Sequence, residues 1–96
     1  MRMLVVIYGG PRPELIPGML DDHGVIGWTQ LSNAHGAGRS GRREGSRAWP
    51  GESQVYFTVL AEDTVAPLSA ALRDLAGAAL PGERLHVAEL PVERFF

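Results

Sequence analysis

The sequence of 96 residues contains no cysteine, no lysine and no apolar run long enough to cross a membrane. Without cysteine there is no disulfide, no thiolate nucleophile and no cysteine-ligated zinc or iron–sulfur site. The apolar start, residues 1–8, is short and no small-residue cleavage site follows it, so we do not interpret it as a secretory signal. These absences favour a cytoplasmic protein.

Length and charge narrow the possibilities further. We expect residues 1–96 to form one domain with a modest core, and such a small fold often gains stability by association. The formal net charge of −2 disfavours a general nucleic-acid binder, so no nucleic acid is expected as a partner. All nine basic side chains are arginines, and four of them cluster: Arg39, Arg42, Arg43 and Arg47.

Hydrophobic patterning predicts four strands and two helices. Continuous or alternating apolar residues indicate strands at residues 3–8, 25–33, 54–60 and 84–90. Helical spacing of apolar side chains indicates helices at about residues 13–23 and 64–79. In the second helix we expect Thr64 to act as the N-cap and Pro67 to lie in the first turn.

The order β-α-β-β-α-β predicts an α+β fold, the ferredoxin-like sandwich, with a long loop between the second and third strands. Two helices then cover one face of a four-stranded antiparallel sheet, and the other face is left open. We expect the open face or an edge to carry Tyr56, Leu60, Leu90 and the Phe95–Phe96 pair. An uncovered apolar face is a reason to oligomerise.

The long loop, residues 35–52, contains five glycines and is predicted to be flexible. Residues 36–41 match G-x-G-x-x-G, but no helix pattern follows, so a dinucleotide-binding site is disfavoured. A hairpin loop, or a loop that binds an anion or a partner, remains open. The candidate residues for partner binding are Arg42, Arg43, Arg47 and Trp49, and Trp49 also suits an anchor at the end of the loop.

Catalytic chemistry has no support in the sequence. No serine lies in a nucleophile-elbow pattern, so we predict no catalytic residues and no enzyme activity. The three histidines are too scattered for a metal motif, and only His35, at the start of the loop, is considered as a metal ligand.

Two motifs together resemble the P-II signalling proteins. GVIGWT at residues 24–29 is similar to that family's second strand, and GAGRSG at 36–41 is similar to the entry of its long T-loop. The resemblance covers nearly the whole chain. It implies a homotrimer that binds an adenine nucleotide or another small anion in clefts between subunits. It also implies that the loop regulates a target protein, such as a membrane transporter, as in nitrogen or transport regulation.

Carried over residue by residue, the resemblance implies ligand contacts at Gly27, Thr29, Gly36, Gly38 and Arg39. The family's phosphate-binding loop and C-terminal nucleotide-binding segment are absent, and Arg84 stands where that loop carries a lysine. Ser40 replaces a glutamine that helps to bind Mg-ATP and 2-oxoglutarate. The loop also lacks the tyrosine that would be uridylylated.

Two alternatives remain open at this point. One is a divalent-metal-binding trimer that resembles the cation-tolerance proteins of similar fold and uses His35 or His86. The other is a small ferredoxin-like enzyme built as a dimeric α+β barrel.

Overall fold

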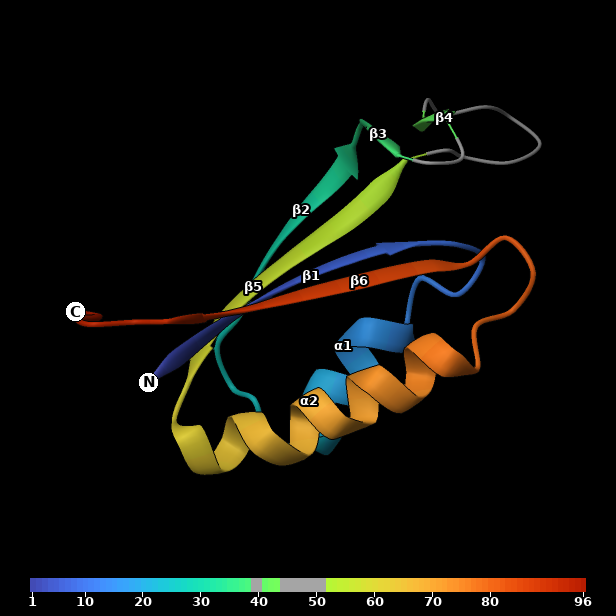
Figure 1. The fold of residues 1–96 in the computed structure, drawn as a ribbon. Coiled ribbons are helices and arrows are strands. Elements are labelled where there is room, and N and C mark those ends of the chain that lie inside the picture. The colour runs from blue at the N-terminus through green and yellow to red at the C-terminus, as the bar shows by residue number, and fades with distance from the viewer. Residues whose placement is uncertain (39–40, 44–51) are drawn as a thin grey trace.

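The computed structural model describes residues 1–38, 41–43 and 52–96. Two helices lie against one face of a twisted four-stranded sheet, and a small two-stranded ribbon extends from one end of that sheet (Figure 1). No helix among the described residues is long and apolar enough to span a bilayer.

The main sheet is antiparallel and has the strand order β2-β5-β1-β6. Its strands are β1 (Arg2–Gly9), β2 (Thr29–Ala34), β5 (Ser53–Leu60) and β6 (Arg84–Pro91). This is the predicted ferredoxin-like arrangement. The first and last strands are neighbours, with Val6 paired with Val87, and β1 lies between β5 and β6.

The two helices begin and end close to the predicted positions. Helix α1 (Leu15–Asp22) ends at His23, whose Nδ1 lies 2.9 Å from the carbonyl oxygen of Met19, and Gly24 follows with a left-handed φ of 72°. Helix α2 (Glu62–Gly77) begins two residues earlier than predicted.

This earlier start corrects two predictions for α2. Ala61, not Thr64, is the N-cap residue, and it makes no side-chain capping bond. The carboxylates of Glu62 and Asp63 lie in the first turn, where they interact favourably with the helix dipole. Pro67 therefore lies inside the helix, beyond the first turn. It removes one N–H donor there.

The core lies between the sheet and the helices. Leu4, Val6 and Tyr8 of β1 point toward the helices and are buried. Tyr56 is 1% exposed and belongs to this core, and Leu60 packs against it. The prediction that these two residues lie at the open face or an edge is therefore wrong, because they share the helix-covered face of β5.

Strand β2 is shorter at its start than predicted. Residues 25–28 do not pair with β5, and pairing begins where Thr29 faces Phe57. The N–H of Val25 donates to the carbonyl of Leu20, and Val25 is buried in the core. Thr58 Oγ1 donates to the carbonyl oxygen of Gly27 at 2.7 Å. These contacts hold the segment as a connection that turns the chain from α1 into the sheet.

Within the predicted loop, the structure adds two short strands. Strand β3 (Gly36–Gly38) pairs antiparallel with β4 (Gly41–Arg43), so the G-x-G-x-x-G motif supplies both sides of a ribbon. Just before it, Asn33 has a φ of 59° and the pairing of β2 with β5 shifts register. The ribbon therefore leaves the sheet at a β-bulge.

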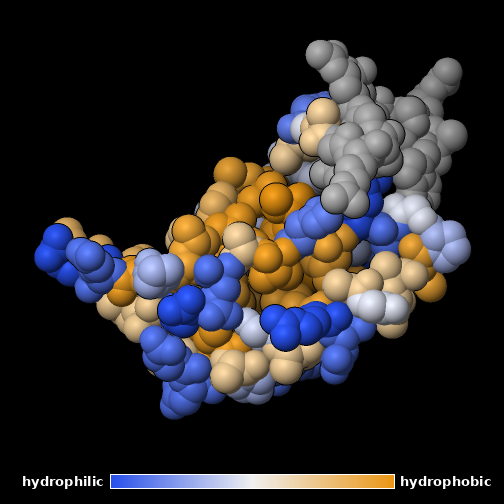
Figure 2. All heavy atoms as spheres, in the orientation of Figure 1, coloured by the Kyte–Doolittle hydropathy of each residue, from blue (hydrophilic) through white to orange (hydrophobic). Residues whose placement is uncertain are grey.

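The face of the sheet away from the helices carries a continuous set of apolar side chains from all four strands. Figure 2 shows hydrophobic residues gathered over the strands on this side. We call this set the open face. By strand register it comprises Met3, Val5, Ile7, Leu31, Val55, Phe57, Val59, Ala88 and Leu90.

Candidate functional site

The described residues that were predicted to bind a ligand fall into two groups. Thr29 begins the edge strand β2, and Gly27 lies in the segment just before it. Gly36 and Gly38 lie in β3, and Arg84 begins β6, so these three residues lie at the end of the sheet where β1 ends.

The two groups are far apart within one chain. Strands β5 and β1 separate β2 from β6, and Thr29 faces Phe57 whereas Arg84 faces Gly9. Interstrand and along-strand spacings then place Thr29 and Arg84 roughly 20 Å apart.

The group at β2 borders an open hollow of about 570 Å³. Gly27 and Thr29 line it together with Phe57, Phe95 and other apolar side chains, and no described lining residue is charged. The polar side-chain groups of the lining are the hydroxyls of Thr29, Thr58 and Thr64 and the indole N–H of Trp28. Such a lining suits a flat heterocycle better than a phosphate.

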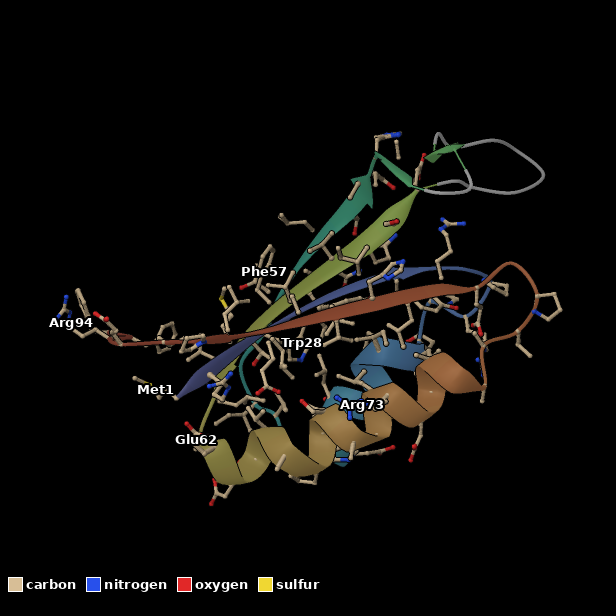
Figure 3. All side chains as sticks on the ribbon, in the orientation of Figure 1. Met1, Trp28, Phe57, Glu62, Arg73 and Arg94 are labelled. Atoms are coloured by element: carbon tan, nitrogen blue, oxygen red, sulfur yellow. The ribbon has the colours of Figure 1, made fainter. Side chains whose placement is uncertain are left out.

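Aromatic packing supports this edge of the sheet from the helix side. The Trp28 and Tyr56 rings have centroids 5.8 Å apart and are tilted by 58°. Figure 3 shows Trp28 between the sheet and the helices, whereas Phe57 projects from the other side. The position of Thr29 is therefore fixed by its neighbour in the core and by pairing with β5.

At the other end of the sheet, Arg84 lies over a glycine. A Cβ atom built on Gly9 would lie 2.3 Å from Arg84 Nη2 and 2.9 Å from Cζ. Gly9 and Arg84 are also paired in the β1–β6 ladder. The guanidinium therefore rests against the β1 backbone, in space that a side chain at position 9 would fill.

A buried carboxylate fixes the turn that precedes Arg84. Glu83 accepts hydrogen bonds from Arg12 Nε at 2.7 Å, Arg12 Nη2 at 2.6 Å and the N–H of Leu80 at 2.8 Å. The Tyr8 hydroxyl donates to the same carboxylate and accepts a bond from the N–H of Arg12. The Glu83 side chain is only 2% exposed. We call these contacts the Glu83 network.

The network shifts the ionisation of its members. Hydrogen bonding from Arg12 lowers the pKa of Glu83 to about 2. Burial, followed by the bond to Glu83, raises the pKa of Tyr8 above its ordinary value. Glu83 is therefore a carboxylate that accepts bonds, and Tyr8 is a neutral donor.

These pKa values predict how stability depends on pH. Because the pKa of Glu83 is lowered from 4.5 in the unfolded chain to about 2 in the fold, its contribution is complete above pH 4.5. We expect that contribution to be lost as the pH falls from 4.5 toward 2. Urea unfolding followed by circular dichroism across this range measures it. A Glu83→Gln variant whose stability declines as steeply as that of the wild type would contradict the assignment.

The remaining predicted site residues are only partly described. Arg42 and Arg43 lie in β4, whereas Arg39, Arg47 and Trp49 lie outside the described residues. His35 is exposed and directly follows β2, on the opposite edge of the sheet from His86 in β6. Among the described residues, no three His, Asp or Glu side chains gather into a possible metal site.

Solved structures resemble this chain over most of its length. One is CPII, a nitrogen regulatory PII-like protein from Thiomonas intermedia K12, bound to ADP, AMP and bicarbonate. It is 25% identical, with a TM-score of 0.73, and the match covers 97% of this chain and 88% of that one. The chain has the PII-like fold. The resemblance inferred from the sequence is thereby confirmed.

Two further structures support the PII-like fold. CPII bound to ADP and bicarbonate is 26% identical, with a TM-score of 0.71 and the same coverage of both chains. A PII-like protein from Thermus thermophilus is 15% identical over 93% of this chain and 85% of its own, with a TM-score of 0.58, and shows the fold alone. No protein-family model matches the chain, and no curated protein sequence matches it.

Sequence reasoning missed four residues at the end of the sheet that carries Arg84. These are Tyr8, Gly9, Arg12 and Glu83. The sequence prediction ends the first strand at residue 8 and gives the following Gly9–Gly10 pair no role in a site. A glycine in a strand can also mark a close approach by another group, and that signal was available.

Proposed function

We propose that this chain is a PII-like regulatory protein that senses a small anionic ligand, an adenine nucleotide, and has no catalytic activity. Three copies assemble through their open faces and bind the ligand in clefts between subunits. The segment at residues 35–52 then regulates a target protein, such as a membrane transporter. The observation that carries the proposal is the PII-like fold shared with a protein bound to ADP, AMP and bicarbonate.

The division of the candidate residues supports a site between subunits. The hollow beside Thr29 is uncharged and apolar, as an adenine ring requires, whereas Arg84 offers a guanidinium fork that matches phosphate oxygens. Because the two lie at opposite edges of one sheet, one chain alone does not bring them to the same ligand. An assembly that places the β2 edge of one copy beside the β6 edge of another would bring Thr29 of the first copy and Arg84 of the second to the same ligand.

The open face supports the assembly itself. Its apolar side chains cross all four strands, and Leu31, Leu90 and the adjoining Phe95 are each more than one-third exposed in the single chain. Burying such a surface against further copies is favourable, at about 25 cal/mol per Å² of apolar area. The glycine-rich ribbon β3–β4 leaves the sheet at one end, away from the helices, where a target can reach it (Figure 1).

Calorimetric titration with ADP tests the ligand. We expect saturable binding by the wild type, and about tenfold weaker binding by Thr29→Val, which removes one hydroxyl and keeps the shape of the side chain. Ser32→Ala, on the same strand, serves as the matched control and should bind as the wild type does. Absence of saturable heat with ADP in the wild type would overturn the nucleotide assignment. A parallel titration with bicarbonate asks whether that anion binds as well.

A further inference from the structure

Gly9 has no conformational reason to be glycine. Its φ lies outside the left-handed region, and it forms the last residue of β1, paired with Arg84 of β6. Glycine in a strand weakens it, because it contributes no side chain to packing and loses more backbone entropy on folding. A glycine at position 9 is therefore explained only if a neighbouring group occupies the space that a side chain there would fill.

That space is occupied by one group. The atoms nearest to a Cβ built at position 9 are all from the guanidinium of Arg84: Nη2 at 2.3 Å, Cζ at 2.9 Å and Nε at 3.2 Å. At the adjoining Gly10, a Cβ would instead meet the Tyr8 hydroxyl and Glu83 Cγ, each at 2.7 Å. The two glycines thus make room for two different groups.

The two groups point to opposite sides of the sheet. Tyr8 belongs to the helix-covered face, so the Glu83 carboxylate that it contacts lies on that side, neutralised by Arg12. Gly9 directly follows Tyr8 in the sequence, and Arg84 directly follows Glu83. Because successive residues of a strand face opposite sides, Gly9 and its partner Arg84 belong to the open face, at the end of the sheet that carries β3. The Glu83 carboxylate is therefore neutralised by Arg12. The Glu83 network fixes the backbone from which the Arg84 side chain extends.

We propose that Gly9 is a positioning residue for anion binding, which holds the Arg84 guanidinium flat against the β1 backbone so that it meets phosphate oxygens in a fixed orientation. A preorganised guanidinium loses less rotational freedom when the anion binds. This inference rests on the proposed function, because it assigns to Arg84 an anionic group of the ligand.

The Gly9→Ala variant tests the proposal selectively. The colliding atoms are the far end of a flexible side chain, so the arginine can swing away while the strand pairing persists. We expect ADP to bind Arg84→Gln about tenfold more weakly than the wild type, and Gly9→Ala to lose a similar factor. The double variant should bind no more weakly than Arg84→Gln alone, because both changes remove the same contact. Gly18→Ala is the matched control, since a Cβ there meets nothing within 4 Å.

A second readout does not need the ligand. In nitrogen-15 spectra of the free protein, the Arg84 Nε–H signal is assigned by its disappearance in Arg84→Gln. We expect it to move or broaden in Gly9→Ala and to stay in place in Gly18→Ala. An unmoved signal, or full ADP affinity in Gly9→Ala, would overturn the role of Gly9. Full ADP affinity in Arg84→Gln would overturn the role of Arg84 as well, and absence of ADP binding in the wild type would overturn the nucleotide assignment on which both depend.

Discussion

Replacing Leu90 by aspartate is expected to convert the proposed trimer into single chains. Leu90 lies on the open face, paired with Met3 of β1, and is 39% exposed in the isolated chain. If three copies bury their open faces against one another, the substitution puts three unpaired carboxylates into an apolar interface. The penalty for burying each is several kcal/mol, which a small interface does not offset. Light scattering after size-exclusion chromatography measures the mass against the 10.4 kDa of one chain.

Strand β6 supplies a closely matched control. Val87 has the same exposed fraction as Leu90, 39%, but it faces the helix side, where it borders the groove between α2 and β6 with Leu72 and Ala76. We expect the Val87→Asp variant to remain a trimer, with a measured mass of three times that of one chain. A wild-type protein that is monomeric, or a Leu90→Asp variant that stays trimeric, would contradict the assignment of the open face as the interface.

Replacing Glu83 by alanine is expected to destabilise the fold by roughly 2–4 kcal/mol, the range for leaving part of a hydrogen-bonded ion pair without its partner. The change removes the acceptor of Tyr8, of both Arg12 nitrogens and of the N–H of Leu80. Three segments of the chain lose their common contact. Urea denaturation at pH 7 and fixed protein concentration measures the change, since the stability of an oligomer depends on concentration.

Glu93→Ala is the control for this substitution. Glu93 is an exposed glutamate in the C-terminal segment, and we expect its removal to change stability by less than about 0.5 kcal/mol. If Glu83→Ala were equally harmless, the contacts of the Glu83 network would contribute little to the fold.

Periodicity was sufficient to predict the architecture, but not which face of the sheet the helices cover. The alternation in β5 separates Val55, Phe57 and Val59 from Tyr56, and the structure keeps that separation. Because a period of two defines two faces without saying which is buried, Tyr56 was assigned to the wrong one. Its burial depends on where α1 and α2 pack, and that is a property of the whole chain.

The parts of the candidate site that could be predicted are those with a local pattern. The short motif at residues 24–29 was enough to select Gly27 and Thr29, which border one hollow, and their contact with a ligand stays a prediction. The Glu83 network could not be predicted, because Arg12 and Tyr8 lie 71 and 75 residues from Glu83 in the sequence. Strands β3 and β4 were missed for a different reason, since glycine contributes no hydrophobic pattern from which to recognise a strand.

The strand order also has a consequence for how the chain folds. Because β5 lies between β2 and β1, the first two strands of the main sheet have no partner until residues 53–60 arrive. A nascent chain that has exposed only β1, α1 and β2 therefore cannot complete any pair of that sheet. Strand β5 has to pair with both β2 and β1, so folding depends on contacts distant in sequence and is expected to be slow for a protein of this size.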